Sequence, residues 1–191
     1  MDFFHKSVML NECIDGLNIK SDGIYVDGTV GGAGHSLEIV KRLGQNGLLI
    51  ALDRDPDAIA AATERLSGYN TIVVKNNFSQ IQNVLNELKI EKIDGMLLDL
   101  GVSSHQLDEG DRGFSYHMDA TLDMRMSQEG LSARDIINEY SQDELSKIIF
   151  EYGEEKFSRR ISENIVIARS QKPIETTLEL AEIIKSSVPA K

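Results

Sequence analysis

Short apolar runs and helical patterns alternate along the first half of the chain. Four runs are rich in β-branched and other apolar residues and end at polar residues: residues 24–27 (IYVD), 48–53 (LLIALD), 71–75 (TIVVK) and 93–100 (IDGMLLDL). Patterns typical of helices follow the first three runs, over residues 36–43, 56–66 and 80–89, the last with Ser79 as its expected cap. This alternation predicts a parallel sheet with helices on both faces, which is an α/β fold.

The second half of the chain has a different pattern. Residues 103–127 are rich in Gly, Asp, His and Ser and show no periodicity. Beyond them, four segments carry apolar residues at the three- and four-residue spacing of helices: residues 132–140, 141–152, 155–170 and 176–187. We therefore expect an α/β unit over residues 1–104 and a loop and helical segment over residues 105–191.

Composition and charge restrict the classes of protein that fit. With 191 residues, 41% of them hydrophobic, the chain can form a globular core. No apolar stretch approaches the roughly 20 residues of a membrane span, and the start lacks the pattern of an export signal, so we expect no membrane association. The single Cys13 cannot form an internal disulfide, which fits a reducing cytoplasm. A net charge of −11 argues against a general nucleic-acid coat protein.

A glycine-rich stretch, residues 27–36 (DGTVGGAGHS), lies between the first strand and the first helix. Glycines there let a ligand approach the backbone closely at the carboxyl end of a strand. The dinucleotide fingerprint G-x-G-x-x-G does not fit because Leu37 stands at its third glycine, and a P-loop would need a nearby Gly-Lys pair. The stretch instead matches a variant of the acidic-x-Gly-x-Gly-x-Gly loop of S-adenosylmethionine-dependent methyltransferases, with Asp27 as its acidic residue. A plain tight turn is the alternative.

Two aspartates end later strands at the same edge of the expected sheet. Asp53 ends the second run, about 20 residues past the glycine-rich stretch, where a carboxylate can accept both ribose hydroxyls of a nucleoside cofactor. It could instead cap the helix that begins at Asp55-Pro56. Asp99 ends the fourth run, where amino-methylating enzymes place an acceptor that localises the lone pair of the target amine and so raises its nucleophilicity. Its alternative role is to cap the following turn.

Eight separate stretches of the sequence together resemble one family. They are HKSVMLNECI, DGTVGGAGHS, LDRDPDAI, NNF, DLGVSSHQLD, RGFSY, DATLDMRMS and YGEEKFSRRIS. This set resembles the bacterial ribosomal RNA small-subunit methyltransferase H family, whose members N4-methylate a cytidine in the decoding region of 16S ribosomal RNA with S-adenosylmethionine. The resemblance implies a Rossmann-like class I S-adenosylmethionine-dependent methyltransferase sheet with a helical insertion domain, acting in the cytoplasm on the 16S ribosomal RNA of the small ribosomal subunit.

The resemblance also implies functional residues at matching positions of this chain. Carried over residue by residue, it places cofactor contacts at Ala33, Gly34, His35, Asp53, Phe78, Asp99 and Gln106, with Asp99 also catalytic. Phe78 could pack on the adenine ring or be a core residue. His35 is expected to act through its backbone, and Gln106 would otherwise be a surface loop residue. No cluster of His, Cys and carboxylates in the sequence has the spacing of a metal site, so no metal is expected.

The chain departs from the family's patterns in two places. After Asp99 the sequence continues Leu-Gly-Val rather than Pro-Pro-aromatic, so a ring that stacks on the target base would come from elsewhere. Phe114 and Tyr116 are candidates for that ring, or else simple loop anchors. The family's sheet continues with further strands after the helical insertion, whereas this chain ends at Lys191. We therefore expect the C-terminal strands to be missing and the uncovered sheet edge to favour a homodimer.

The last part of the chain holds a local excess of basic residues. Residues 156–172 have a local charge of +4, from one acidic residue and five basic ones: Lys156, Arg159, Arg160, Arg169 and Lys172. We expect the ribosomal RNA to bind there, with Arg125 as a further contact, although a solvated helix face is the alternative. Two rival functions stay open: a nucleotide-dependent oxidoreductase, and a non-catalytic ribosome-assembly module that keeps the cofactor pocket.

Overall fold

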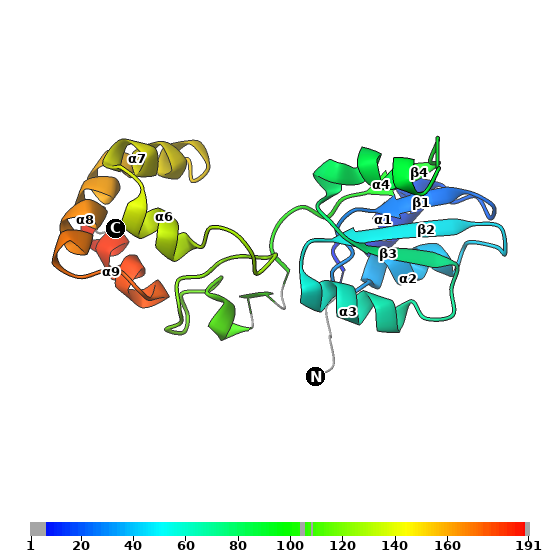
Figure 1. Ribbon diagram of the computed structural model, residues 1–191, viewed down its shortest axis with the longest axis horizontal. Helices are drawn as coiled ribbons and strands as arrows, with labels where there is room; N and C mark the ends of the chain where they lie inside the picture. Colours follow the sequence, from blue (N-terminus) through cyan, green and yellow to red (C-terminus); the bar gives the residue numbers. More distant parts are fainter. Residues whose placement is uncertain (1–6, 104–105, 108, 190–191) are drawn as a thin grey trace. The chain divides into compact units, whose positions relative to one another are not determined.

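The computed structural model describes residues 7–103, 106–107 and 109–189 of the 191-residue chain. The chain divides into two compact units, Met1–Ser103 and Ser104–Lys191. The first unit contains a parallel sheet, and the second consists of helices and loops (Figure 1). Within the described ranges, no helix has both the length and the apolar character needed to cross a membrane.

Four parallel strands form the sheet in the described part of the first unit, in the order β3-β2-β1-β4 (Figure 1). Their bounds are β1 Ile24–Asp27, β2 Leu48–Asp53, β3 Thr71–Lys75 and β4 Gly95–Leu97. This order matches the beginning of the usual Rossmann order, so the predicted Rossmann-like α/β fold is confirmed. The first three strands have the predicted bounds, but β4 is shorter than expected and ends two residues before Asp99.

The helices of the first unit connect and flank these strands. Their bounds are α1 Leu10–Leu17, α2 Gly34–Val40, α3 Pro56–Arg65, the 3₁₀ helix η1 Phe78–Gln80 and α4 Ile81–Glu87. The helix α1 was not predicted from the sequence. The prediction of Ser79 as a cap was wrong, because Asn77 precedes η1 and its side chain accepts the Ser79 N–H at 2.9 Å. The chain therefore enters α4 through a short 3₁₀ turn.

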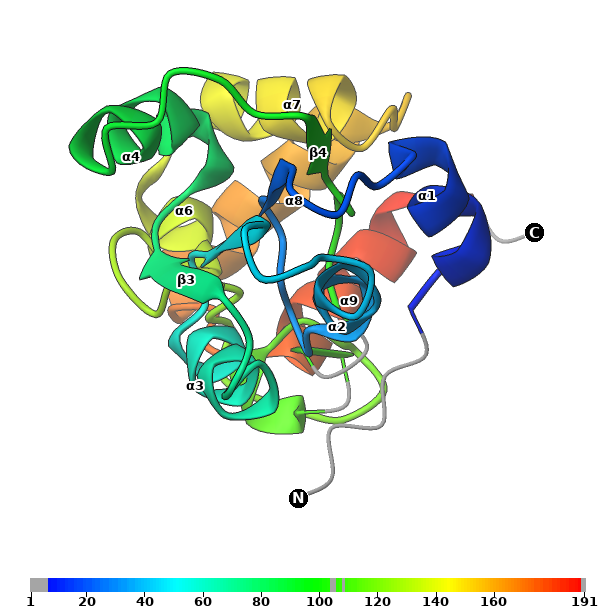
Figure 2. The same cartoon turned by 90° about the vertical axis from the view of Figure 1, so that its right-hand side faces the viewer.

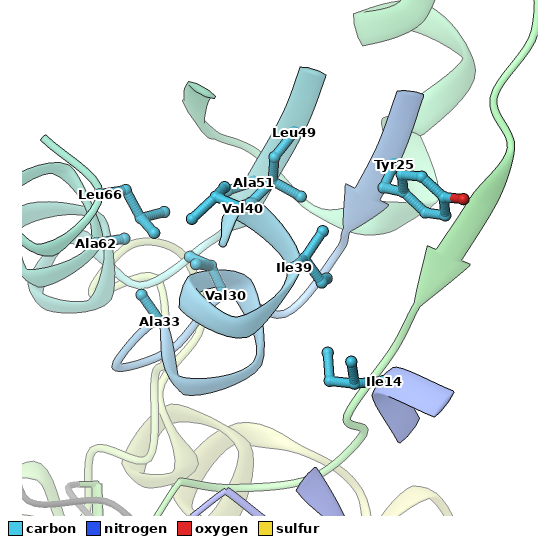
Figure 3. Close-up of a cluster of buried hydrophobic side chains, with 10 residues drawn as sticks. All are labelled: Ile14, Tyr25, Val30, Ala33, Ile39, Val40, Leu49, Ala51, Ala62 and Leu66. Atoms are coloured by element: carbon cyan, nitrogen blue, oxygen red, sulfur yellow. The ribbon is translucent and has the colours of Figure 1, made fainter. Parts of the chain in front are cut away.

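Alternate residues of the strands pack against helices on opposite faces of the sheet. On one face Tyr25, Leu49 and Ala51 form a buried cluster with side chains from α1, α2 and α3 (Figure 3). On the other face Val26, Ile50 and Leu52 pack with side chains of α4, which lies on the opposite side of the sheet from α2 (Figure 2). Because both faces are covered, the strands are apolar at nearly every position, as in other parallel sheets.

The second unit is built from four described α-helices and the short 3₁₀ helix η2 Gly110–Arg112. The α-helices are α6 Ala133–Glu139, α7 Gln142–Glu151, α8 Ser158–Gln171 and α9 Thr177–Ser187. Three of them begin with a capping box, in which a hydroxyl and a carboxylate three residues later satisfy free N–H groups at the helix start. Leu145, Ile161 and Ile165 lie in the buried core of this unit.

Residues before α6 are held against the start of α9. The Leu122 N–H donates to the Glu175 carbonyl at 2.9 Å, and the Thr177 N–H donates to the Ala120 carbonyl at 2.9 Å. The Arg134 guanidinium binds both carboxylate oxygens of Glu175, at 2.5 and 2.8 Å. The segment that lacks periodicity in the sequence is therefore fixed here by hydrogen bonds rather than by a regular element.

Candidate active site

The glycine loop, which we define as residues 28–33, connects β1 to α2 at the carboxyl edge of the sheet. Its Val30 N–H donates to the Leu52 carbonyl at 2.8 Å, and the Val30 and Ala33 side chains are buried in the cluster of Figure 3. Gly31 has φ +46° and Ala33 has φ 59°, both in the left-handed region. A Cβ at Gly31 would meet only the Thr29 carbonyl oxygen, at an ordinary contact distance of 3.9 Å, so glycine serves there for its backbone conformation. The loop is thus anchored by its own apolar residues.

Asp27 ends β1 directly below the glycine loop. It is 1% exposed, and one carboxylate oxygen accepts the Thr29 N–H at 3.1 Å while the other accepts the Ser36 hydroxyl at 2.6 Å. Burial raises the pKa of Asp27, against the opposing effect of these two hydrogen bonds. The acidic residue of the motif therefore holds the loop and the start of α2 in place and does not face solvent.

The substitution Asp27→Asn should make stability less sensitive to pH. A carboxyl group with a raised pKa binds its proton more tightly in the folded state, so wild-type stability falls as pH rises from its ordinary pKa to the raised one. The asparagine side chain of the variant does not titrate. Urea unfolding of both proteins between about pH 4 and about pH 7 should show the variant gaining stability relative to wild type as pH rises. Parallel pH profiles would contradict this assignment.

Asp53 ends β2 and lies beside the glycine loop. One of its oxygens accepts the Gly31 N–H at 3.0 Å, and the other accepts the Asp55 N–H at 2.9 Å. Asp55 is the residue that caps α3, by accepting the Asp57 N–H at 3.1 Å. The alternative role of Asp53 as a helix cap therefore belongs to Asp55. Each carboxylate oxygen has a second lone pair, so Asp53 keeps the capacity to accept hydroxyls.

The far end of α3 also contacts the loop. The Arg65 guanidinium, in the last turn of α3, donates to the Gly32 carbonyl at 2.6 Å. The loop is thereby held from one side by Asp53, which precedes α3, and from another by Arg65, which ends it. Arg65 was not predicted to take part, because no local pattern links a helix-ending arginine to a carbonyl 33 residues earlier.

The start of α2 packs against residues that precede α1. His35 is 6% exposed, and its Nε2 lies 3.0 Å from the Val8 carbonyl. Since a carbonyl can only accept, Nε2 carries the proton of this hydrogen bond. A Cβ at Gly34 would lie 1.9 Å from the Ser7 hydroxyl oxygen, so glycine permits this close approach. The His35 side chain has a structural partner, and a cofactor contact through its backbone stays a prediction.

Asp99 lies beside the glycine loop, beyond the end of β4. The last ladder bond between these segments joins the Gly28 N–H to the Leu97 carbonyl at 3.0 Å. Past it, the Asp99 N–H donates to the Thr29 hydroxyl oxygen at 2.7 Å. Among the residues that the structure describes, the half-buried Asp99 carboxylate has no hydrogen-bond partner. It can therefore accept a hydrogen bond from a ligand at this edge.

Apolar side chains lie next to these polar groups. A Cβ at Gly28 would approach Leu98 Cδ2 to 2.5 Å, Phe78 Cβ to 3.1 Å and Met96 Cε to 3.2 Å, so these three side chains gather around Gly28. Phe78 is 36% exposed and Leu100 is 67% exposed, which places both at the surface rather than in the core. An exposed apolar surface beside a few directed polar groups is the usual composition of a small-molecule site.

Three further residues from the sequence analysis belong to the second unit. Gln106 is buried, Phe114 is half-buried with the Arg112 guanidinium 5.7 Å from its ring centroid, and Tyr116 is 66% exposed. The exposure of Tyr116 leaves its ring able to stack on a base. Their contacts with cofactor or substrate stay predictions.

Other parts of the described chain do not add to this site. No group of three or more His, Cys, Asp and Glu side chains in the described ranges is arranged to hold a metal ion. A hollow of about 440 Å³ is lined by Val40, Leu43, Gly44, Gln45, Gly47 and residues 68–70. These residues precede β2 and β3, so the hollow lies at the amino edge of the sheet, opposite the glycine loop.

Curated relatives of this chain carry one shared name. Proteins named "Ribosomal RNA small subunit methyltransferase H" are 58% identical in Lachnospira eligens, 58% identical in Clostridium botulinum strain Kyoto and 57% identical in Clostridioides difficile strain 630. Each match covers 100% of this chain and 62% of the relative. The chain thus spans less than two thirds of the length of these relatives.

The family comparison covers almost the whole chain. The sequence profile of the MraW methylase family matches residues 2–191. Its matched region includes the glycine loop, Asp53, Asp99 and all four helices of the second unit. On the strength of this match, the chain belongs to the MraW methylase family.

Proposed function

We propose that this chain provides the cofactor-binding and catalytic region of an S-adenosylmethionine-dependent enzyme that N4-methylates a cytidine of 16S ribosomal RNA. The observation that carries the proposal is that the anchored glycine loop, the Asp53 carboxylate and the unpartnered Asp99 carboxylate lie together at the carboxyl edge of a Rossmann-like sheet in the described part of the chain. The shared name of the relatives supports the class of substrate.

The residues at this edge fit S-adenosylmethionine. When bound, the cofactor would supply an electrophilic methyl group on a sulfonium. Asp53 would accept its ribose hydroxyls, and the exposed Phe78 and Leu98 would pack on the adenine. The glycine loop, with Ala33 and Gly34 at the start of α2, would hold the methionine part, because backbone there is not shielded by large side chains.

Asp99 would orient and activate the substrate amine. The lone pair of the N4 amine of cytidine is delocalised into the ring, so it is a weak nucleophile. A cytidine flipped out of its stack would present this amine to Asp99. The Asp99 carboxylate or the neighbouring Leu100 carbonyl would accept a hydrogen bond from one of the N–H groups of the amine. This hydrogen bond localises the lone pair on nitrogen and orients it toward the methyl carbon, in line with the carbon–sulfur bond. As the nitrogen–carbon bond formed, the carbon–sulfur bond would break with its electron pair going to sulfur, and the nitrogen would release one proton.

Calorimetric titration of the complete protein separates this proposal from the oxidoreductase alternative. We expect S-adenosylhomocysteine to bind and NADH not to bind, because the glycine loop lacks the third glycine of the dinucleotide fingerprint. Binding of NADH alone would overturn the proposal. The non-catalytic assembly module is separated by single-turnover methylation of small ribosomal subunits, which it would fail to carry out.

The RNA would contact the exposed face of α8 and the residues before it. Arg159 and Arg160 are exposed and have no ion-pair partner among the described residues. Lys156 is exposed too, with its ammonium 5.4 Å from the Phe157 ring centroid. Two basic residues of this region are held by the protein: Arg169 donates to the Ile137 and Tyr140 carbonyls at the end of α6, at 2.6 and 2.5 Å, and Lys172 pairs with Glu179. The basic face is therefore smaller than the sequence count suggests.

Arg125 is also held by the protein. Its guanidinium binds the Asp123 carboxylate and donates to the Gly130 carbonyl at 3.2 Å. The hydrogen bond from Arg125 lowers the pKa of Asp123. The Asp123 carboxylate therefore neutralises the positive charge of Arg125, the residue that was expected to contact the RNA.

Self-association through a sheet edge also stays a prediction.

Replacing Arg160 or Arg169 with Gln should give opposite results. Arg160→Gln should leave the free energy of unfolding within about 0.5 kcal/mol of wild type. It should weaken binding to small-subunit RNA and reduce the slope of log K against log salt concentration by about one. Arg169→Gln should lower the free energy of unfolding by about 2 kcal/mol, because two carbonyls lose a charged donor. Denaturant unfolding and salt-dependent RNA titrations measure both. Unchanged RNA binding by Arg160→Gln would remove this face from the proposal.

A further inference from the structure

Thr29 connects two segments that meet at the candidate site. Its hydroxyl oxygen accepts the N–H of Asp99, 70 residues later in the chain, at 2.7 Å. Its own N–H donates to the buried Asp27, whose other oxygen accepts the Ser36 hydroxyl. A continuous path of hydrogen bonds thus runs from the start of α2 through Asp27 and Thr29 to Asp99.

The segment that carries Asp99 has few other restraints. β4 ends at Leu97, and residues 98–103 contain no helix or strand. Leu98 packs beside Gly28 but is still 41% exposed, and Leu100 is 67% exposed, so apolar packing restrains the two neighbours of Asp99 only in part. Gly101, two residues after Asp99, has φ +142°, a backbone conformation that residues with side chains rarely adopt. Among the described residues, the hydrogen bond to Thr29 is the one that ties Asp99 itself to the anchored glycine loop.

We propose that Thr29 is a positioning residue, whose hydroxyl fixes the Asp99 backbone so that the Asp99 carboxylate meets the substrate amine. This inference rests on the proposed function. Because reaction rates depend steeply on alignment, a displacement of about 1 Å can cost about a hundredfold. The β-branched side chain of Thr has few rotamers, so its hydroxyl is held in the orientation that Asp99 requires. Thr29 would thus connect the glycine loop, which would hold the cofactor, to Asp99, which would bind the substrate amine.

Two substitutions isolate the hydroxyl from the rest of the side chain. Thr29→Val keeps the shape and the backbone N–H that binds Asp27 but removes the acceptor. Thr29→Ser keeps the acceptor and removes the methyl group. We expect Thr29→Val to lower the single-turnover methylation rate of the complete protein at saturating cofactor by about tenfold or more. Its affinity for S-adenosylhomocysteine should change by less than about threefold, and Thr29→Ser should recover most of the rate.

Three results of the rate and binding measurements would overturn the inference: a wild-type rate for Thr29→Val, a rate for Thr29→Ser as low as that of Thr29→Val, or equal losses of rate and cofactor affinity. A merely structural role predicts the last of these, together with a lowered melting temperature. Amide hydrogen exchange gives a readout that does not depend on activity. The Asp99 amide should exchange faster in Thr29→Val than in Thr29→Ser, and equal protection of this amide in the two variants would contradict the inference. This readout applies even to an inactive protein. An inactive wild-type protein would refute the proposed function instead.

Discussion

Asp99→Asn should lower the single-turnover rate of methyl transfer by about a hundredfold at saturating cofactor. The variant keeps the size of the side chain and one acceptor oxygen but loses the negative charge that polarises the amine. Its backbone N–H, which donates to Thr29, is unaffected, so the segment after β4 should keep its position. The loss should therefore appear in the rate rather than in the amount of cofactor required.

Rapid-quench assays of the complete protein with small ribosomal subunits measure this rate. Calorimetry with S-adenosylhomocysteine supplies the control, since it reports the cofactor site without the chemical step. A variant with a normal saturated rate and only a raised cofactor requirement would show that Asp99 binds the cofactor but does not act on the amine.

Asp53→Ala should weaken the binding of S-adenosylhomocysteine by at least about tenfold. Each charged hydrogen bond to a ribose hydroxyl contributes about 1.5 to 3 kcal/mol, and the substitution removes the acceptor of both. The Gly31 N–H also loses its partner, so part of the loss will come from a looser glycine loop. Asp53→Asn keeps one acceptor for Gly31 and should lose less affinity than Asp53→Ala.

A matched control for Asp53 is available on α3. Asp57→Ala removes an exposed carboxylate from the first turn of the same helix, where its backbone N–H still meets Asp55. Its affinity for S-adenosylhomocysteine should stay within about twofold of wild type. If Asp53→Ala remains folded by thermal unfolding and binds with unchanged affinity, the ribose assignment is wrong.

The strands could be predicted because the sheet is buried on both faces. Residues 24–27, 48–53 and 71–75 are short apolar runs between polar residues, and burial on both faces requires such runs. The fourth run stays apolar to Leu100, yet β4 ends at Leu97 because the following residues leave the sheet toward Thr29. Apolar character alone cannot distinguish a buried strand residue from an exposed apolar residue at a candidate ligand site.

The side-chain contacts that shape the site could not be predicted in the same way. Spacing identified Asp27 and Asp53 because strand ends in a parallel sheet meet at one edge. The contacts of Thr29 with Asp99 and of Arg65 with Gly32 join residues 70 and 33 positions apart, and no local period encodes them. Counting charges likewise could not show that Arg169 caps α6, because a solvated and a structural arginine look alike in a sequence.

Nucleoside mass spectrometry of 16S ribosomal RNA would show whether this enzyme methylates N4 of cytidine. Small subunits that lack the modification would be incubated with the complete protein and S-adenosylmethionine carrying a deuterated methyl group, and the RNA would be digested to nucleosides. We expect a deuterated methyl group on N4 of cytidine, formed by the wild-type protein and strongly reduced in Asp99→Asn. A labelled methyl group on C5 of cytosine or on a ribose hydroxyl, or no labelled nucleoside from a protein that binds S-adenosylhomocysteine, would contradict it.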